Sequence, residues 1–211
     1  MPAEPRTLRA DAARNRDKLL AAAEREFGER GLDVPLEHIA RRAGVSIGTL
    51  YAHFPTREAL LDAVVPQRLS ALDRVVAAAL AEPDPWDGFV AFVEGVFALQ
   101  AQDRGLNDAL ARRLPPSPEV ARACRRGMEQ AELIIARAKA GGRLRADFDL
   151  ADLSVLTWAI SQVIRQTADT APLAWRRCLA FYLDGLRAGA AHPVVVPALS
   201  RDQLTGPAPR S

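Results

Sequence analysis

The sequence predicts an all-α protein with a small three-helix N-terminal domain and a larger helical C-terminal domain. Apolar residues recur at helical spacing over most of the chain, and glycines and prolines interrupt this pattern at intervals. Ser, Thr or Asp precedes several of the periodic segments, where such side chains cap helices. No segment alternates with the period of two that a half-buried strand requires, because the valines at 194–196 lie in a proline-flanked tail.

Length and composition suit a globular protein of one or two domains. The chain has 211 residues, of which 49% are hydrophobic and 26% are charged. No apolar run approaches the ~20 residues of a membrane span, and the polar N-terminus is unlike a secretory signal. We therefore expect a cytoplasmic protein without a membrane partner.

The side chains that carry catalysis or bind metals form no motif. Cys124 and Cys178 are far apart, and the three histidines form no ligand cluster. Buried free thiols are a better interpretation of the cysteines than a redox switch. No phosphate-binding glycine loop and no nucleophile motif is present. We expect neither an enzyme nor a bound cofactor or metal.

The first elements are expected to form a helix-turn-helix domain over residues 12–56. A basic arm at 1–11, which could meet DNA phosphates or remain a solvated leader, leads into a helix at about 12–30. Two short helices follow at 36–43 and 46–53, separated by Gly44, which can adopt the left-handed conformation that ends a helix. Ser46 can cap the second, and Leu50 and Phe54 share its inner face. This arrangement places the second short helix in the DNA major groove.

The rest of the chain is expected to be helical up to about residue 190. Thr56 can cap a helix at 57–81, in which Pro66 predicts a kink or break. Further helices are expected at about 85–103, 106–114, 118–140, 149–167 and 173–188, with Asp84, Ser117 and Asp149 as caps. The tail at 191–211 is expected to be loosely ordered.

The run from residue 14 to residue 61 resembles the N-terminal DNA-binding domain of the TetR family of bacterial transcriptional regulators. The resemblance rests on Ala21, Ala22, Phe27, Gly31, the block IARRAGVSIGTLYAHF at 39–54, Arg57, Leu60 and Leu61. It implies a homodimer that binds double-stranded operator DNA, with residues 57–190 forming a domain that binds a small-molecule effector and dimerises. Many relatives have Thr or Ser at the start of the second helix, where this chain has Val34, Pro35 and Leu36.

The candidate DNA contacts lie mainly on the second short helix. The resemblance implies that Thr49, Tyr51 and His53 contact DNA, largely at phosphates, and that Arg57 takes the place of a phosphate-binding lysine. Gly48 lets the backbone approach the duplex closely. Arg42 is a further candidate, although an ion-paired surface arginine is the stronger interpretation for it. The predicted DNA-binding set is Arg14, Arg42, Ser46, Ile47, Gly48, Thr49, Tyr51, His53 and Arg57.

The C-terminal helices offer candidates for an effector pocket and for a dimer interface. Large apolar residues of the middle helices could line a pocket, although each is more often plain core: Trp86, Phe89, Phe92, Phe97, Met128 and Trp158. The last two helices are apolar over more than one face, which favours an intersubunit four-helix bundle over purely internal packing. Its predicted residues are Leu153, Leu156, Ile160, Ile164, Trp175, Leu179, Tyr182 and Leu186.

These features predict a ligand-responsive DNA-binding regulator, a repressor that releases its operator when a small molecule binds. An activator of the same family is the nearest alternative. A small-molecule binding protein with a vestigial DNA-binding module is a second alternative, although the intact GTLYAHF segment argues against it. A helical enzyme would need a convergent set of titratable groups, which the sequence does not display.

Overall fold

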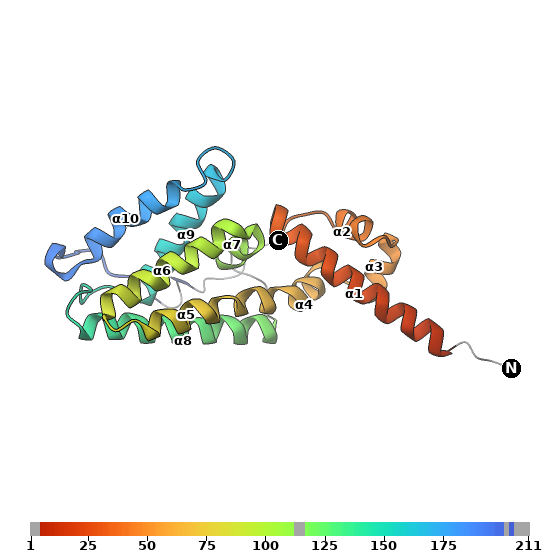
Figure 1. Ribbon diagram of the computed structural model, residues 1–211, viewed down its shortest axis with the longest axis horizontal. Coiled ribbons are helices and arrows are strands. Elements are labelled where there is room, and N and C mark those ends of the chain that lie inside the picture. Colours follow the sequence, from red (N-terminus) through yellow and green to blue (C-terminus); the bar gives the residue numbers. More distant parts are fainter. Residues whose placement is uncertain (1–4, 112–116, 201–202, 205–211) are drawn as a thin grey trace.

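The computed structural model describes residues 5–111, 117–200 and 203–204. At one end of the molecule lie α1 (Pro5–Arg30), α2 (Leu36–Ala43) and α3 (Ile47–His53), and α4 (Arg57–Ser70) runs from them into the rest of the chain (Figure 1). The described residues contain no strand, only an isolated bridge between Leu144 and Arg187. The all-α prediction is confirmed.

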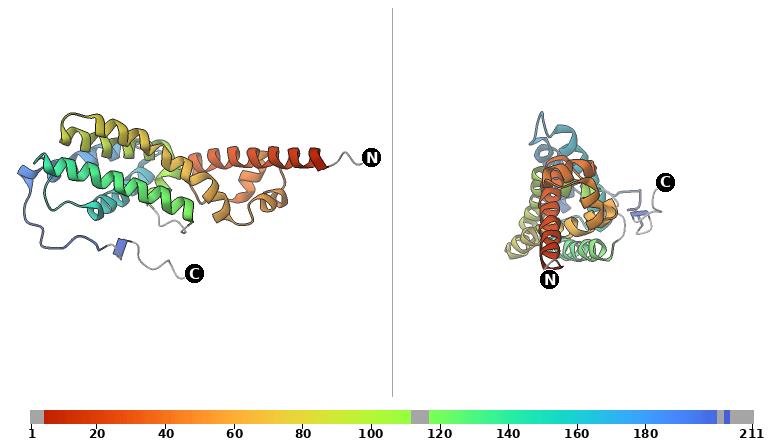
Figure 2. Two further views of the ribbon diagram at one scale, coloured as in Figure 1. Left: turned by 90° about the horizontal axis from the view of Figure 1, so that it is seen from below. Right: turned by 90° about the vertical axis from the view of Figure 1, so that its right-hand side faces the viewer.

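The C-terminal part is a bundle built around one helix. Its elements are α5 (Leu72–Ala81), α6 (Pro85–Gln102), α7 (Arg104–Ala111), α8 (Pro118–Ala140), α9 (Leu150–Thr167), α10 (Ala174–Leu186) and a short 3-10 turn at Ala188–Ala190. Helix α6 contacts all five other helices of this part. The ribbon views place α5 and α8 along one side of it and α9 and α10 along the other (Figures 1 and 2).

Side-chain caps fix where five of the helices begin, namely α3, α4, α6, α8 and α9. In each case a hydroxyl or carboxylate accepts hydrogen bonds from first-turn N–H groups that have no partner inside the helix. At Asp149 the cap is reciprocal, because Asp152 accepts from the Asp149 N–H in return. The caps are the residues expected from the sequence: Ser46, Thr56, Asp84, Ser117 and Asp149.

Two helix boundaries differ from expectation. Helix α1 begins at Pro5, so most of the expected flexible arm is helical, because proline suits a first helical turn and no breaker follows it. Helix α4 passes through Pro66, and the break before α5 lies at Ala71 instead. Pro66 and Asp62, whose carbonyl loses its usual donor, are partly exposed. Solvent can therefore satisfy that carbonyl without ending the helix.

Two apolar cores divide the molecule. The first joins α1 to α4, with Phe27 and Leu50 fully buried, and it continues into α7 and α8 through Leu106 and Ala123. The second fills the space between α5, α6, α8, α9 and α10. The first core includes α4, beyond the boundary expected at residue 56, so the helix-turn-helix part shares its core with helices of the larger domain.

Several other sequence features can be located in the fold. No helix of the described residues is long and apolar enough to cross a membrane. Within the same residues no group of three or more His, Cys, Asp or Glu is placed to hold a metal ion. Cys124 and Cys178 are free and half-buried, and burial raises the pKa of the Cys124 thiol. The valines at 194–196 are exposed and form no strand.

Candidate functional site

The turn between α2 and α3 has the geometry of a helix-turn-helix. Gly44 is left-handed, with φ 70° and ψ 31°, and its N–H donates to the Arg41 carbonyl (3.1 Å). Ser46 is extended, and its Oγ accepts a hydrogen bond from the Thr49 N–H (3.1 Å). Leu50 and Phe54 are buried in the first core. The inner face of α3 is thereby fixed and its outer face is directed to solvent.

The outer face of α3 is open and partly apolar. Tyr51 is 46% exposed and Ile47 is 36% exposed, and Gly48 between them is also exposed. The polar side chains of this region that were predicted to contact DNA are less free to do so. Thr49 and His53 are half-buried, and the Ser46 Oγ lies 2.9 Å from the Thr49 Oγ1 besides capping the helix. On α3, the predicted contacts whose side chains project most freely are therefore Ile47 and Tyr51, with the exposed Gly48 backbone between them.

The predicted arginine contacts have partners within the chain. Arg42 ion-pairs with Glu29 (2.6 Å) and with the buried Glu26 (2.9 Å), which ties α2 to α1. The Arg42 guanidinium lowers the pKa of Glu29, and the two carboxylates raise the pKa of Arg42. Arg14 ion-pairs with Asp11. Arg42 thus takes the ion-paired role that was the stronger interpretation of its sequence context.

Arg57 has a structural role that its position in the sequence did not reveal. Its guanidinium donates to the Leu32 carbonyl at 2.9 Å in a partly buried site. Two other arginines of α1 and α2 lie in the same part of the chain. Arg41 is exposed and makes no ion pair with any described residue, and Arg16 lies over the Phe54 ring at 5.4 Å. The Arg41 guanidinium is therefore less engaged by neighbouring carboxylates than the Arg42 guanidinium is.

The segment after α1 is held to the C-terminal bundle. The Leu32 N–H donates to the buried Asp108 carboxylate of α7 (2.9 Å), and Asp108 also ion-pairs with Arg165 of α9 (3.1 Å). Gly31 has φ +86°, and a Cβ there would lie 2.5 Å from the Asp108 Oδ2. Only glycine fits this approach. The Leu32 N–H thus donates to Asp108 and the Leu32 carbonyl accepts from Arg57, so side chains of α7 and α4 hold both backbone groups of this residue.

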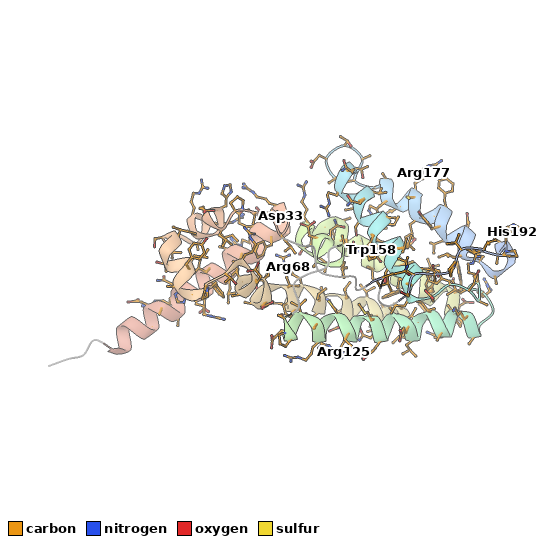
Figure 3. All side chains as sticks on the ribbon, turned by 180° about the vertical axis from the view of Figure 1, so that it is seen from behind. Asp33, Arg68, Arg125, Trp158, Arg177 and His192 are labelled. Atoms are coloured by element: carbon orange, nitrogen blue, oxygen red, sulfur yellow. The ribbon has the colours of Figure 1, made fainter. Side chains whose placement is uncertain are left out.

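A second bridge lies between α1, α4 and the end of α6. Arg68 ion-pairs with Asp103 and donates to the Glu24 carbonyl, and Figure 3 shows its side chain where the two parts meet. A shallow, open hollow lies beside it, lined by Glu24, Arg25, Val64, Gln67, Arg68 and Asp103. These residues are not among the predicted effector contacts.

The predicted pocket residues divide into three groups. Trp86, Phe89, Phe92 and Phe97 are buried in the second core. Trp158 is half-buried on α9, within the C-terminal bundle in Figure 3. Met128 lies on the outer face of α8 and is 52% exposed. The expectation for Met128 is therefore corrected, because its side chain points away from the bundle interior.

Most predicted dimer residues are covered within the single chain. Tyr182 is 44% exposed and Leu186 is half-buried, and the remaining six are buried: Leu153, Leu156, Ile160, Ile164, Trp175 and Leu179. Those six match the internal packing that was the alternative interpretation. The large apolar side chains that α9 and α10 do expose are Val155, Phe181 and Tyr182.

Comparisons with known proteins agree with this geometry. The family model described as bacterial regulatory proteins of the tetR family matches residues 19–64, and the model of the SbtR-like transcriptional regulator C-terminal domain matches residues 84–188. A comparison with curated protein sequences found no match.

Solved structures extend the similarity over both domains. A TetR transcriptional regulator from Streptomyces coelicolor is 34% identical, with 82% of this chain and 98% of that chain covered and a TM-score of 0.52. A TetR-family regulator from Pectobacterium atrosepticum is 26% identical, covering 85% and 97%, with a TM-score of 0.56. FadR from Bacillus subtilis in complex with stearoyl-CoA shares the fold at 16% identity, covering 83% and 99%, with a TM-score of 0.60. The chain belongs to the TetR family of bacterial transcriptional regulators.

Proposed function

We propose that this regulator is a homodimeric repressor that reads a two-fold-symmetric operator with α3 and releases it when a small molecule binds the C-terminal bundle. The observation that carries the proposal is the outer face of α3. Ile47 and Tyr51 project, on either side of the exposed Gly48, from a helix whose opposite side is fixed by the buried Leu50. A helix held in this way can enter the major groove as a rigid unit.

The glycine at position 48 supports a close contact between α3 and DNA. A Cβ at this position would meet nothing nearer than the Ser46 Oγ at 3.8 Å, so the fold itself does not require glycine there. Glycine also lowers helix stability by about 1 kcal/mol relative to alanine. A close approach of the α3 backbone to DNA accounts for a glycine at an exposed helical position.

Dimerisation is proposed through α9 and α10. These helices expose Phe181, Tyr182 and Val155 on their surface, and Phe181 is 64% exposed. Apolar groups gathered on neighbouring helices favour association with a second copy. Two recognition helices about one helical turn apart (~34–36 Å) would then contact adjacent half-sites.

Effector control is supported by ligand-bound proteins with the same fold. The solved structures include RolR in complex with resorcinol, with a TM-score of 0.56, and FadR in complex with stearoyl-CoA, with a TM-score of 0.60. Release requires the effector to bind a DNA-incompetent arrangement of the dimer more tightly than the competent one.

The first test is a gel-shift and footprinting assay with the DNA flanking the gene, at fixed salt and with excess competitor DNA. Selection from random DNA follows if that segment is not bound. A two-fold-symmetric footprint supports the proposal, and failure of both assays would overturn it. A promoter reporter then separates repression from activation.

Matched variants test the α3 contacts. Gly48→Ala is expected to weaken operator binding about tenfold while the melting temperature stays equal or rises. Tyr51→Ala should weaken binding to a similar degree without unfolding the protein. Met128→Ala, at an exposed position on α8, serves as the control and should bind like the wild type. Unchanged affinity in both α3 variants would contradict the assignment.

A further inference from the structure

A small polar cluster is enclosed in the apolar interior of the C-terminal bundle. Gln100 of α6, Asn107 of α7 and Ser161 of α9 are each at most 3% exposed. The Ser161 Oγ donates to the Gln100 Oε1 at 2.6 Å, and the Asn107 Nδ2 donates to the Ser161 carbonyl at 3.3 Å. Three helices therefore meet at one group of uncharged hydrogen-bonding side chains.

The cluster leaves hydrogen-bonding capacity unused. Among the described residues, neither the Gln100 Nε2 nor the Asn107 Oδ1 has a hydrogen-bond partner, although both atoms are fully buried. The buried indole N–H of Trp175 on α10 also has no hydrogen-bond partner among the described residues. The Trp175 ring centroid lies 6.3 Å from that of Phe97. Unpaired buried polar atoms are rare and costly in folded proteins. A donor and an acceptor presented by neighbouring side chains suit a hydroxyl group, which can both accept and donate.

The surroundings of the cluster favour an uncharged ligand. The charged side chains close to the cluster along the chain already have partners. Asp108 pairs with Arg165 at 3.1 Å, Asp103 pairs with Arg68, and Arg104 pairs with Asp169 at 2.9 Å. Phe97 and Ile160, which flank the cluster on α6 and α9, are fully buried and apolar. A charged ligand would lose its hydration here without gaining a counter-ion.

We propose that Gln100, Asn107 and Ser161 anchor the effector, and that this effector is a neutral, mainly apolar molecule with a hydroxyl group. The proposal rests on the proposed function, because it assigns the site and chemical class of the effector invoked there. Its apolar body would pack against the side chains of the second core beside the cluster.

The position of the cluster explains how its occupancy reaches the DNA-binding end. Asn107 is followed directly by Asp108, whose carboxylate holds the Leu32 N–H. Helix α7 contacts α1 and α4 as well as α6 and α9, and its Leu106 and Ala109 are buried in the first core. A ligand entering between α6, α7 and α9 must displace α7. That displacement moves the Asp108 carboxylate relative to the Leu32 N–H, which lies in the segment between α1 and α2.

Matched probe pairs test the site without DNA. Phenol with toluene, and cyclohexanol with methylcyclohexane, differ mainly in the hydroxyl group, and calorimetry measures their binding to the full-length protein. We expect a hydroxyl probe to bind about tenfold more tightly than its apolar match. Gln100→Leu or Ser161→Ala should remove this preference, whereas Gln102→Leu, at an exposed position of the same helix, should keep it.

Several results would overturn the proposal. Equal binding of matched probes would do so, as would a hydroxyl preference that survives in both variants. A crystal structure grown with phenol that contains only an ordered water at Gln100 and Asn107 would also overturn it. Because this assay contains no DNA, operator binding and release by another class of compound could persist, which would leave the proposed function standing.

Hydrogen exchange tests the route to the DNA-binding end. Phenol binding is expected to speed exchange of the Leu32 amide in the wild-type protein, because the Asp108 acceptor moves. An unchanged Leu32 exchange rate in the phenol-saturated protein would contradict the coupling through α7.

Discussion

The carboxylate of Asp108 joins α7 to the segment after α1 and to α9. It is buried on α7, accepts the Leu32 N–H at 2.9 Å and pairs with Arg165 at 3.1 Å. In Asp108→Ala both groups lose this partner. Leu32 is itself buried, so its N–H would be left without an acceptor and away from water.

The expected cost follows from these two contacts. A hydrogen bond to an ionised acceptor contributes about 1.5–3 kcal/mol, and a buried donor left unpaired loses that contribution. The Arg165 side chain is 37% exposed and can be hydrated, so its pairing adds at most about 1 kcal/mol. Together these give a loss of about 2–4 kcal/mol, or a lowering of the melting temperature by about 4–16 °C.

Urea unfolding followed by circular dichroism, at fixed protein concentration, measures this loss. Asp169→Ala is the matched control, because Asp169 also pairs with an arginine, Arg104, at 2.9 Å, but its side chain is 86% exposed. It should cost less than about 1 kcal/mol. Asp108→Asn keeps an acceptor for Leu32 and should fall between the two. An Asp108→Ala protein as stable as Asp169→Ala would show that the buried Asp108 contacts contribute no more than an exposed ion pair.

Three further predictions concern other described groups. Arg57→Ala should weaken operator binding and also lower the free energy of unfolding by about 1–2 kcal/mol, since the Leu32 carbonyl loses its donor. Unchanged stability would show that the hydrogen bond from Arg57 to Leu32 does not stabilise the fold. Burial raises the pKa of the Cys124 thiol, so Cys124 should react with iodoacetamide at neutral pH about tenfold more slowly than in the unfolded chain. Peptide mass spectrometry measures both rates, and equal rates would contradict the protection by burial. Arg42 lowers the pKa of Glu29 below its ordinary 4.5, so the Glu29 carboxylate stabilises the fold above that pH and the stabilisation disappears as the pH falls through the lowered value. Melting temperatures of the wild type and Glu29→Gln should therefore differ at pH 7 and converge in acid, and a gap that persists in acid would count against the ion pair.

Local chemistry made much of this fold predictable from the sequence. The caps at Ser46 and Asp149 act within a single turn, and so does the left-handed Gly44. Helical spacing separates buried from exposed side chains in the same local way, as with Leu50 and Tyr51 on α3. These signals determined the helices, the helix-turn-helix and the face of α3 that is open to solvent.

Contacts between distant segments were decided only by the tertiary structure. Leu32 and Asp108 are 76 positions apart, and Gln100 and Ser161 are 61 apart. Nothing in the periodicity of α8 distinguishes Met128, which faces solvent, from a residue lining the bundle. The sequence alone determined which residues form helices and which side of each helix is apolar, because caps and periodicity act within a few residues. Which helices meet, and hence which polar side chains pair, depends on packing between segments that have no local signal for one another.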